Sequence, residues 1–464
     1  HLHPLGLILI GFGIQELVAG ELRQPTMVFA PATQRPVEIA GHTISLRGSD
    51  INSRFAWLTV PRLITTAAYF IIAFGALLRV FRYVYWSMWL DEGFALLYSQ
   101  QSWKSVVGLN GFYSPHPPLY FSLTKVFNLV FSDASAGRTL SLVCGLLTLP
   151  FFYLLARRLM DPIASLIATL VFVLSPIHIY YSQEARMYAL VVLTVTVSYY
   201  ALVSFLQTGN KWYAVLYGGA LVVAAYGDYS ALFAIAPQIA IILYMLWRNW
   251  RRMVPIILAG VAAVLLYAPW LPQVWHSVNS ANEDERRSEY LGAGFSRVLI
   301  IVLRITGVAS DQTGPYFPSL QPTAWDNFDK LHLIILLGMA PVVILGLIGL
   351  WRRWMLATTT MALLGTIVVT AVISVVSPSF AERSVLSVSV GWALLLGAAF
   401  NGKRRRSQTF VATASLLFIL LICLNSINII QTYGVKSRWD DAAADLAESQ
   451  PLHYPVVTYS YGEV

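Results

Sequence analysis

Long apolar stretches recur along most of the chain, and they constrain its fold more than any other feature. A membrane-spanning helix needs about 20 predominantly apolar residues, and stretches of roughly this length occur about eleven times. They lie near residues 63–82, 139–156, 163–180, 187–206, 212–227, 231–247, 254–272, 331–350, 355–376, 384–400 and 408–430. Charged residues make up only 12% of the sequence, well below the proportion in soluble domains. We therefore expect an all-α polytopic membrane protein with about 11 transmembrane helices.

Lysine and arginine are distributed unevenly among the loops between these stretches. They gather in every second loop, which the positive-inside rule places in the cytoplasm. The basic positions are Arg157, Arg158, Lys211, Arg248, Arg251, Arg252, Arg352, Arg353 and Lys403 to Arg406. The net charge of +8 thus reflects topology, and we exclude nucleic acid as a partner. The other loops, including 83–138 and 273–330, are predicted to lie on the extracytoplasmic side. The membrane is predicted to be the inner (plasma) membrane.

Three regions are predicted along the chain. Residues 1–60 form an N-terminal segment of unknown role. Its apolar run 5–19 is short and is expected to be interfacial or a twelfth span, and residues 20–60 lack clear periodicity. Residues 61–430 form the transmembrane domain. Residues 431–464 have a soluble composition and are expected to begin an extracytoplasmic α/β domain. In the first outer loop, the short apolar segments 94–107 and 119–131 are predicted to be helices lying in the membrane interface.

Nearly all strong polar clusters fall on the predicted outer side. The tripeptide Leu90-Asp91-Glu92 follows the first apolar stretch, where a charge close to hydrocarbon costs a few kcal/mol. We therefore expect these two acids to have a function outside the bilayer. A charge-lined pore would instead place ionisable groups in the middle of the spans, and those interiors are almost free of them. The distribution favours a functional site at the outer membrane surface.

Asp91 and Glu92 are the candidate catalytic acids. A carboxylate near apolar surface can have its pKa raised towards working pH, which suits a general base. The second acid would then orient a neighbour or bind a metal. The alternative is structural, because acidic residues commonly occupy the first turn of a helix.

Four arginines at the outer ends of spans are candidate phosphate ligands: Arg79, Arg138, Arg186 and Arg383. Guanidinium groups bind phosphate through paired hydrogen bonds, so several of them at a membrane surface suit a lipid phosphate or diphosphate. The alternative for each is an ordinary contact with phospholipid headgroups. Arg186 is the strongest candidate because it lies two residues from both Glu184 and Tyr188.

His116 precedes Pro117-Pro118 and is therefore held in an extended conformation. Its side chain is a candidate for contacting phosphate, ligating a metal or capping the following helix. A metal would need oxygen or nitrogen ligands nearby, for which Glu92 and Glu184 are the candidates. Asp228 lies in a tight outer turn, where a role in the turn alone is equally consistent with the sequence.

Together these motifs resemble the GT-C superfold of membrane glycosyltransferases. Within it, they are most similar to the branch of protein O-mannosyltransferases, aminoarabinose transferases and bacterial family 39-like relatives. The motifs are Arg79 ahead of Ser87 to Glu92, His116 to Leu119, Gly137 to Ser141, Tyr181 to Tyr188, and Glu382-Arg383. The resemblance covers roughly residues 65–464 and leaves the N-terminal segment out. Where many relatives carry His-Tyr, this chain has Asp228-Tyr229.

The resemblance implies an inverting glycosyltransferase that uses a polyprenyl-phosphate-linked sugar. The acceptor is a protein, a lipid or a glycan. Asp91 matches the catalytic base, with Glu92 beside it. The implied phosphate ligands are His116, Arg138, Arg186, Arg383 and Arg79, and the implied pocket residues are Gln183, Glu184, Tyr188, Asp228 and Tyr229. No cofactor is required, although Mg²⁺ or Mn²⁺ can replace part of the arginine charge.

Two other classes of function remain open from the sequence. A transporter or lipid flippase would need broken helices or polar residues at the midplane, for which Pro237 and Pro341 are the main candidates. A non-catalytic relative acting as a scaffold in a larger assembly would keep the fold but not the site.

Overall fold

The computed structural model describes residues 60–81, 83–84, 88, 90–109, 116–131, 133–279, 305, 330–351, 353–376 and 382–402. The chain divides into two compact units, His1–Ala67 and Ala68–Val464, and the second contains nearly all of the described residues. The predicted last span at 408–430 and the predicted soluble region at 431–464 lie outside the described residues, as does nearly all of the N-terminal segment.

Every regular element among the described residues is helical, as the sequence predicted. The longer helices are α3 (Val60–Val80), α7 (Asp133–Leu159), α8 (Pro162–Val173), α10 (Tyr188–Thr208), α11 (Lys211–Gly227), α12 (Ser230–Tyr267), α16 (Lys330–Trp351), α17 (Trp354–Val376) and α18 (Val388–Ala398). The shorter ones are α4 (Leu90–Gln100), α5 (Trp103–Val106), α6 (Leu119–Phe127), α9 (Pro176–Ser182), η1 (Ala268–Trp270), α13 (Leu271–Asn279) and η3 (Glu382–Val385).

Five helices in the described part are long and apolar enough to cross a membrane, or six if α8 and α9 form one bent span. The chain is therefore a polytopic helical membrane protein, which confirms the predicted class. The total of about 11 spans stays a prediction. The segments predicted as interfacial helices are helical, in α4, α5 and α6.

Local sequence explains where several helices begin and end. Helix α10 ends at Gly209, whose φ of 70° is the left-handed conformation that glycine adopts most easily. Asn210 then caps α11 by accepting a hydrogen bond from the backbone N–H of Trp212 at 3.0 Å. Pro162 occupies the first position of α8, where the missing N–H costs nothing.

The stretch predicted as one span at 163–180 is bent by 58° between α8 and α9. Ser175 has an extended backbone (φ −62°, ψ 113°) because it precedes Pro176, whose ring disfavours the helical conformation one residue earlier. Similarly, the predicted spans 231–247 and 254–272 meet in α12 at Asn249, whose backbone is non-helical (φ −158°, ψ 78°). The basic residues predicted to form a cytoplasmic turn lie at this break.

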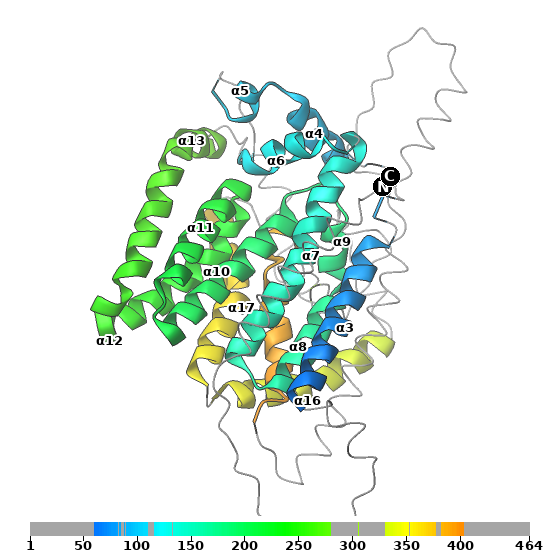
Figure 1. The fold of residues 1–464 in the computed structure, drawn as a ribbon, viewed down its shortest axis with the longest axis vertical. Helices are drawn as coiled ribbons and strands as arrows, with labels where there is room; N and C mark the ends of the chain where they lie inside the picture. The colour runs from blue at the N-terminus through cyan, green and yellow to red at the C-terminus, as the bar shows by residue number, and fades with distance from the viewer. Residues whose placement is uncertain are drawn as a thin grey trace, which may run out of the picture. The chain divides into compact units, whose positions relative to one another are not determined.

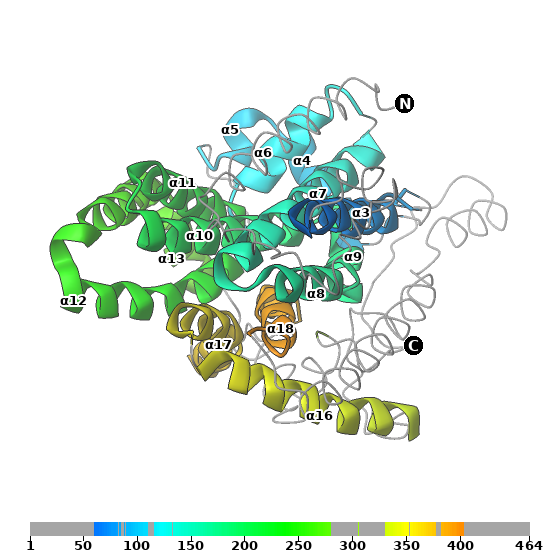
Figure 2. The ribbon, with the colours of Figure 1, turned by 60° about the horizontal axis from the view of Figure 1, so that its bottom comes forward.

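Helix α10 forms the centre of the bundle and packs against α7 and α11, while α18 packs against α8 and α17 (Figures 1 and 2). Nearly all of the α10 side chains are buried. In contrast, α12 exposes large apolar side chains such as Leu243, Leu258 and Leu265. A face of this kind on a polytopic protein is suited to lipid contact.

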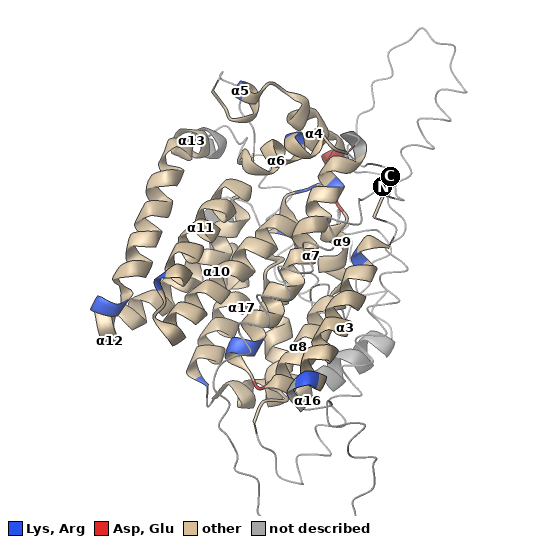
Figure 3. Ribbon diagram, in the orientation of Figure 1, with Lys and Arg blue, Asp and Glu red and all other residues tan. Residues whose placement is uncertain are grey.

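Charged residues lie mainly towards the ends of the helices, and the helix middles carry few of them (Figure 3). At one end, Asp161 accepts hydrogen bonds from Arg353 and from the backbone N–H of Gly402, both at 2.8 Å. These contacts join the start of α8 to the loops flanking α17 and α18. The other end of the bundle carries α4, α5 and α6 (Figure 1).

Candidate active site

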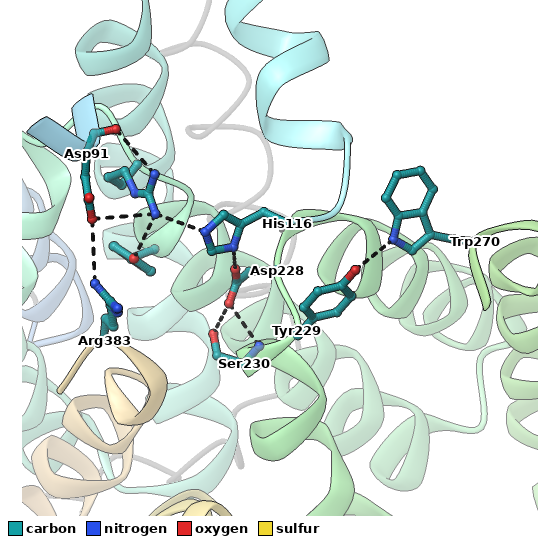
Figure 4. A network of polar contacts seen from close by, with 9 residues as sticks. Asp91, His116, Asp228, Tyr229, Ser230, Trp270 and Arg383 are labelled. Atoms are coloured by element: carbon teal, nitrogen blue, oxygen red, sulfur yellow. Dashed lines mark hydrogen bonds and ion pairs between the residues drawn. The ribbon is translucent and has the colours of Figure 1, made fainter. Parts of the chain in front are cut away.

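Several polar residues predicted from the sequence converge at the end of the bundle where α4, α6, α10 and α12 begin. Asp91 lies in the first turn of α4, His116 just ahead of α6, Arg186 just ahead of α10 and Asp228 just ahead of α12. Arg383 joins them from η3. Figure 4 shows this network. Helix starts carry partial positive charge from unpaired N–H groups, so their convergence favours an anionic ligand.

Glu92 and Arg138 form a buried ion pair beneath this network. Arg138 donates from Nε and Nη2 to the two carboxylate oxygens of Glu92 at 2.8 and 2.6 Å. The backbone N–H of Ala185 donates to the same carboxylate at 2.8 Å. Glu92 thus fixes α4 to α7 and to the turn before α10. This geometry favours a positioning role for both residues over the predicted catalytic and phosphate-binding roles.

Helix α7 also holds the turn before α10 through small and polar residues. A Cβ atom at Gly137 would lie 2.8 Å from that of Ala185, so glycine is required for this close approach. Ser141 donates its hydroxyl hydrogen to the carbonyl oxygen of Arg186 at 2.9 Å, and Tyr120 donates to the carbonyl of Gly137 at 3.0 Å. The backbone that carries the Arg186 side chain is therefore well fixed.

Replacing Glu92 by glutamine is expected to destabilise the protein, because it removes the carboxylate charge that accepts two hydrogen bonds from the buried guanidinium of Arg138. Removing one member of a buried ion pair typically costs about 3–5 kcal/mol. Thermal unfolding in detergent should show a lower midpoint for Glu92→Gln and little change for the neighbouring control Asp91→Asn, whose side chain is 24% exposed. Equal midpoints for Glu92→Gln and the wild type would contradict the positioning role.

Arg186 is the centre of the network, and its side chain is only 7% exposed. Nη2 donates to His116 Nε2 at 3.1 Å and to the Tyr188 hydroxyl at 3.4 Å, and Nη1 donates to the backbone oxygen of Asp91 at 3.3 Å. Nε is buried and has no hydrogen-bond partner among the residues that the structure describes. Burial lowers the pKa of Arg186, but Tyr188 and the nearby carboxylates of Asp91 and Glu184 outweigh it and raise the pKa.

Asp91 faces two arginines. Its Oδ2 lies 3.8 Å from Arg186 Nη2 and 3.6 Å from Arg383 Nη1. The Arg383 side chain is 39% exposed, so this edge of the network is accessible from outside the protein. An acidic oxygen between two guanidinium groups marks a place where an anion is electrostatically favoured.

His116 links Arg186 to Asp228. Its Nδ1 lies 3.2 Å from Asp228 Oδ2, while Nε2 receives the hydrogen bond from Arg186. Burial lowers the pKa of His116, and the charges of Arg186 and Arg383 lower it further against the opposing effect of Asp228. The pKa of Asp228 is also lowered: burial raises it, but His116 and Ser230 outweigh that effect. The network therefore holds a neutral imidazole and an ionised carboxylate.

The lowered pKa of His116 predicts how stability depends on pH. As the pH falls below 6.5, the ordinary pKa of histidine, His116 binds a proton in the unfolded chain before it does so in the folded chain. The free energy of unfolding therefore falls with decreasing pH. Above that value this contribution is constant. Thermal unfolding measured at about pH 8 and about pH 5.5 should differ more for the wild type than for His116→Gln. An equal difference in both proteins would contradict the neutral state of His116.

The other predicted pocket residues lie around this network. Tyr188 is buried, with its ring 5.7 Å from the guanidinium carbon of Arg186. Glu184 is buried, and its backbone oxygen accepts from the N–H of Arg186 at 2.7 Å. Tyr229 accepts a hydrogen bond from Trp270 at 3.2 Å. The sequence interpretation missed Trp270, which no local pattern indicated.

Arg79 and Gln183 lie in a different set of contacts. Arg79 is fully buried and donates to the carbonyls of Gly75 and Val173 at 2.8 and 3.0 Å and to His178 Nδ1 at 2.8 Å. Gln183 donates to the carbonyls that end α3, including that of Arg79 at 2.9 Å. Both residues hold α3 against α9. This arrangement does not support a phosphate-binding role for Arg79 or a pocket role for Gln183.

The predicted metal candidates were Glu92, His116 and Glu184. Among the residues that the structure describes, no group of three or more histidine, cysteine or acidic side chains is placed to hold a metal ion. Both ring nitrogens of His116 contact protein groups, and the Glu92 carboxylate accepts hydrogen bonds from Arg138 and from the backbone of Ala185. Metal dependence stays a question for experiment.

The family comparison matches the central part of the chain. Residues 115–275 match a family model described as dolichyl-phosphate-mannose-protein mannosyltransferase. This range includes His116, Arg138, Arg186 and Asp228 but neither Asp91 nor Arg383. None of the curated proteins matches the chain significantly.

Solved structures extend the similarity over most of the chain. The archaeal oligosaccharyltransferase AglB from Archaeoglobus fulgidus, in complex with an inhibitory peptide and a dolichol-phosphate, has a TM-score of 0.52 and 14% sequence identity. The match covers 86% of this chain and 59% of that one. The chain has the GT-C glycosyltransferase fold. ArnT from Cupriavidus metallidurans in the apo state is similar with a TM-score of 0.48 and 14% identity, over 82% of this chain and 76% of that one.

The predicted GT-C fold is thus confirmed by the structural similarity. The family model matches only residues 115–275, and the predicted glycosyltransferase class stays a prediction. The chain spans 59% of the length of the archaeal oligosaccharyltransferase. On this fold, the network around Arg186 lies where the segment containing α4, α5 and α6 meets the starts of α10 and α12. The sequence predicted that these loops share one side of the membrane.

Proposed function

We propose that the protein transfers a sugar from a polyprenyl-phosphate-linked donor to an acceptor, with inversion, on the outer face of the inner (plasma) membrane. The observation that carries the proposal is the convergence of Arg186 and Arg383 on the Asp91 carboxylate at an accessible edge of the network. Two guanidinium groups at the ends of membrane helices suit a lipid phosphate, which can enter sideways from the bilayer.

In this proposal Asp91 is the general base and the arginines stabilise the leaving group. Asp91 removes the proton from an acceptor hydroxyl, whose oxygen attacks the anomeric carbon of the donor sugar. The bond between that carbon and the phosphate oxygen breaks, and the lipid phosphate leaves with one additional negative charge. Arg186 and Arg383 neutralise this developing charge. In this proposal the arginines supply the positive charge that a divalent cation would otherwise bring.

Donor binding would also prepare Asp91 for its role. A phosphate that engages Arg186 and Arg383 takes them away from the Asp91 carboxylate, because anionic phosphate and guanidinium form strong paired hydrogen bonds. Loss of neighbouring positive charge makes a carboxylate a stronger base. The donor would thereby activate the base only when it is in place, which limits wasteful reaction with water.

The accessible edge of the network also bears on the scaffold alternative. A non-catalytic relative would be expected to close this site with neighbouring side chains. Instead, Asp91, His116 and Arg383 keep 24%, 27% and 39% of their side-chain surface exposed. This exposure favours an enzyme.

Native mass spectrometry of the purified protein, followed by lipid extraction, tests the proposal. We expect a co-purified polyprenyl phosphate, and transfer of labelled sugar when the polyprenyl-phosphate-sugar and membrane acceptors are supplied. Recovery of bulk phospholipids alone, together with no sugar transfer from such a donor, would overturn the proposed function.

A further inference from the structure

A chain of hydrogen bonds runs from the start of α12 to the central arginine (Figure 4). The hydroxyl and the backbone N–H of Ser230 donate to Asp228 Oδ1 at 2.5 and 2.9 Å. The other carboxylate oxygen, Oδ2, contacts His116 Nδ1 at 3.2 Å. His116 Nε2 in turn contacts Arg186 Nη2 at 3.1 Å. Asp228 therefore reaches Arg186 through one imidazole ring.

Donor and acceptor chemistry fixes the direction of every bond in this chain. A guanidinium group has only donors, so His116 Nε2 must present its lone pair to Arg186. The ring hydrogen is then on Nδ1 and is donated to Asp228 Oδ2. A backbone N–H is also only a donor, so the atom at the Oδ1 position of Asp228 must be an oxygen. The tautomer of His116 thus depends on an acceptor at the Oδ2 position.

We propose that Asp228 is a positioning residue for the phosphate-binding arginine, which it holds by fixing the tautomer and orientation of His116. Asp228 itself is buried and does not need to touch the substrate. The inference rests on the proposed function, because it gives Arg186 the role of binding the donor phosphate. It goes beyond that function by assigning a task to the turn between α11 and α12.

Asp228→Asn separates this task from a merely structural one. Asparagine caps a helix start as well as aspartate does, so the turn is expected to survive. The two donors of Ser230 will select the amide oxygen of Asn, which places the NH₂ group opposite His116 Nδ1. Nδ1 must then accept, the ring hydrogen moves to Nε2, and two donors face each other between His116 and Arg186. One atom of residue 228 is exchanged, and the hydrogen bond from Arg186 to His116 is lost.

The experiment measures binding of undecaprenyl phosphate to the full chain in detergent for four proteins. These are the wild type, Asp228→Asn, His116→Gln and the double variant. Asp228→Asn should weaken binding by about 10-fold or more, the size of loss that outer-shell partners cause at metal sites, while its unfolding transition stays cooperative. In His116→Gln, the amide oxygen of Gln accepts the hydrogen bond from Arg186, and an amide has no tautomers that residue 228 could select. Adding Asp228→Asn to this variant should therefore weaken binding little further.

Other outcomes separate this inference from the proposed function. Unchanged binding by Asp228→Asn would overturn the inference. So would a loss of binding from Asp228→Asn that is equally large in the wild type and in His116→Gln. Arg186→Ala serves as the reference variant. If Arg186→Ala also binds as tightly as the wild type, the proposed phosphate site itself is wrong. If Arg186→Ala loses binding while Asp228→Asn keeps it, only the role of Asp228 fails.

Discussion

Arg186→Lys is expected to bind polyprenyl phosphate roughly 100-fold more weakly than the wild type, although the positive charge is kept. Lysine is a point charge on a flexible chain and cannot reproduce the planar set of N–H donors. The guanidinium of Arg186 reaches the Asp91 backbone oxygen, His116 and the Tyr188 hydroxyl at once. These contacts orient Nε and the remaining N–H groups, and a lysine would lose that orientation.

Titration with undecaprenyl phosphate in detergent provides the measurement. The matched control is Arg251→Lys, because Arg251 is an exposed arginine at the break in α12 that stacks on Trp250, away from the network. Comparable binding by Arg186→Lys and Arg251→Lys would show that charge alone matters at position 186, and the geometric role given to this residue would be wrong.

Asp91→Asn is expected to lose sugar transfer by about 100-fold to 10,000-fold, the range that a general base typically contributes. Donor binding should survive or tighten, because the variant removes a carboxylate that competes for Arg186 and Arg383. The unfolding midpoint should change little, since the side chain is partly exposed and its ion pairs, at 3.8 and 3.6 Å, are long. Transfer is thus predicted to fall strongly while donor binding does not weaken.

Two assays on the same preparation test this prediction. One measures transfer of labelled sugar from a polyprenyl-phosphate donor, and the other measures binding of the lipid phosphate. Asp161→Asn is the matched control, because Asp161 pairs with Arg353 outside the network around Arg186. Full transfer activity in Asp91→Asn would reject Asp91 as the base, whereas loss of binding together with transfer would make it a binding residue instead.

The hydropathy of the sequence predicted most of the helices, because long apolar runs in a membrane have few alternatives to helix. It did not predict the bend within the 163–180 run, nor that the predicted turn between 231–247 and 254–272 is a single non-helical residue. Pro176 turns the 163–180 stretch into a bent pair, and Asn249 interrupts α12 without a loop. The bend at Pro176 is a local backbone event within an apolar stretch, and hydropathy averages over it.

The candidate site was predictable in its composition but not in its pairing. The sequence placed Asp91, His116, Arg186 and Asp228 on one side of the membrane, and the structure brings them into one network. The sequence ranked Arg186 first among the arginines, but it did not indicate which of the others pair with groups of the protein. Arg138 pairs with Glu92, 46 residues away, and such long-range pairing follows from helix packing.

Arg79 illustrates the same limit of sequence reasoning. Its position at the end of the first apolar stretch suggested a phosphate ligand. In the structure its side chain is buried against α9 and contacts His178, 99 residues away.

A local signal did exist at Asp228, because Asp-Tyr-Ser is a pattern in which the acid can bond to the backbone two residues on. Its link to His116, 112 residues earlier, required the fold.

The central claim is that Arg186 and Arg383 bind the phosphate of a polyprenyl-linked donor beside Asp91. A cryo-electron microscopy map of the protein with undecaprenyl phosphate tests it most directly. We expect phosphate density within hydrogen-bonding distance of both guanidinium groups, with the Asp91 carboxylate no longer between them. Phosphate density elsewhere on the protein, with Asp91 still paired to Arg186 and Arg383, would contradict the claim.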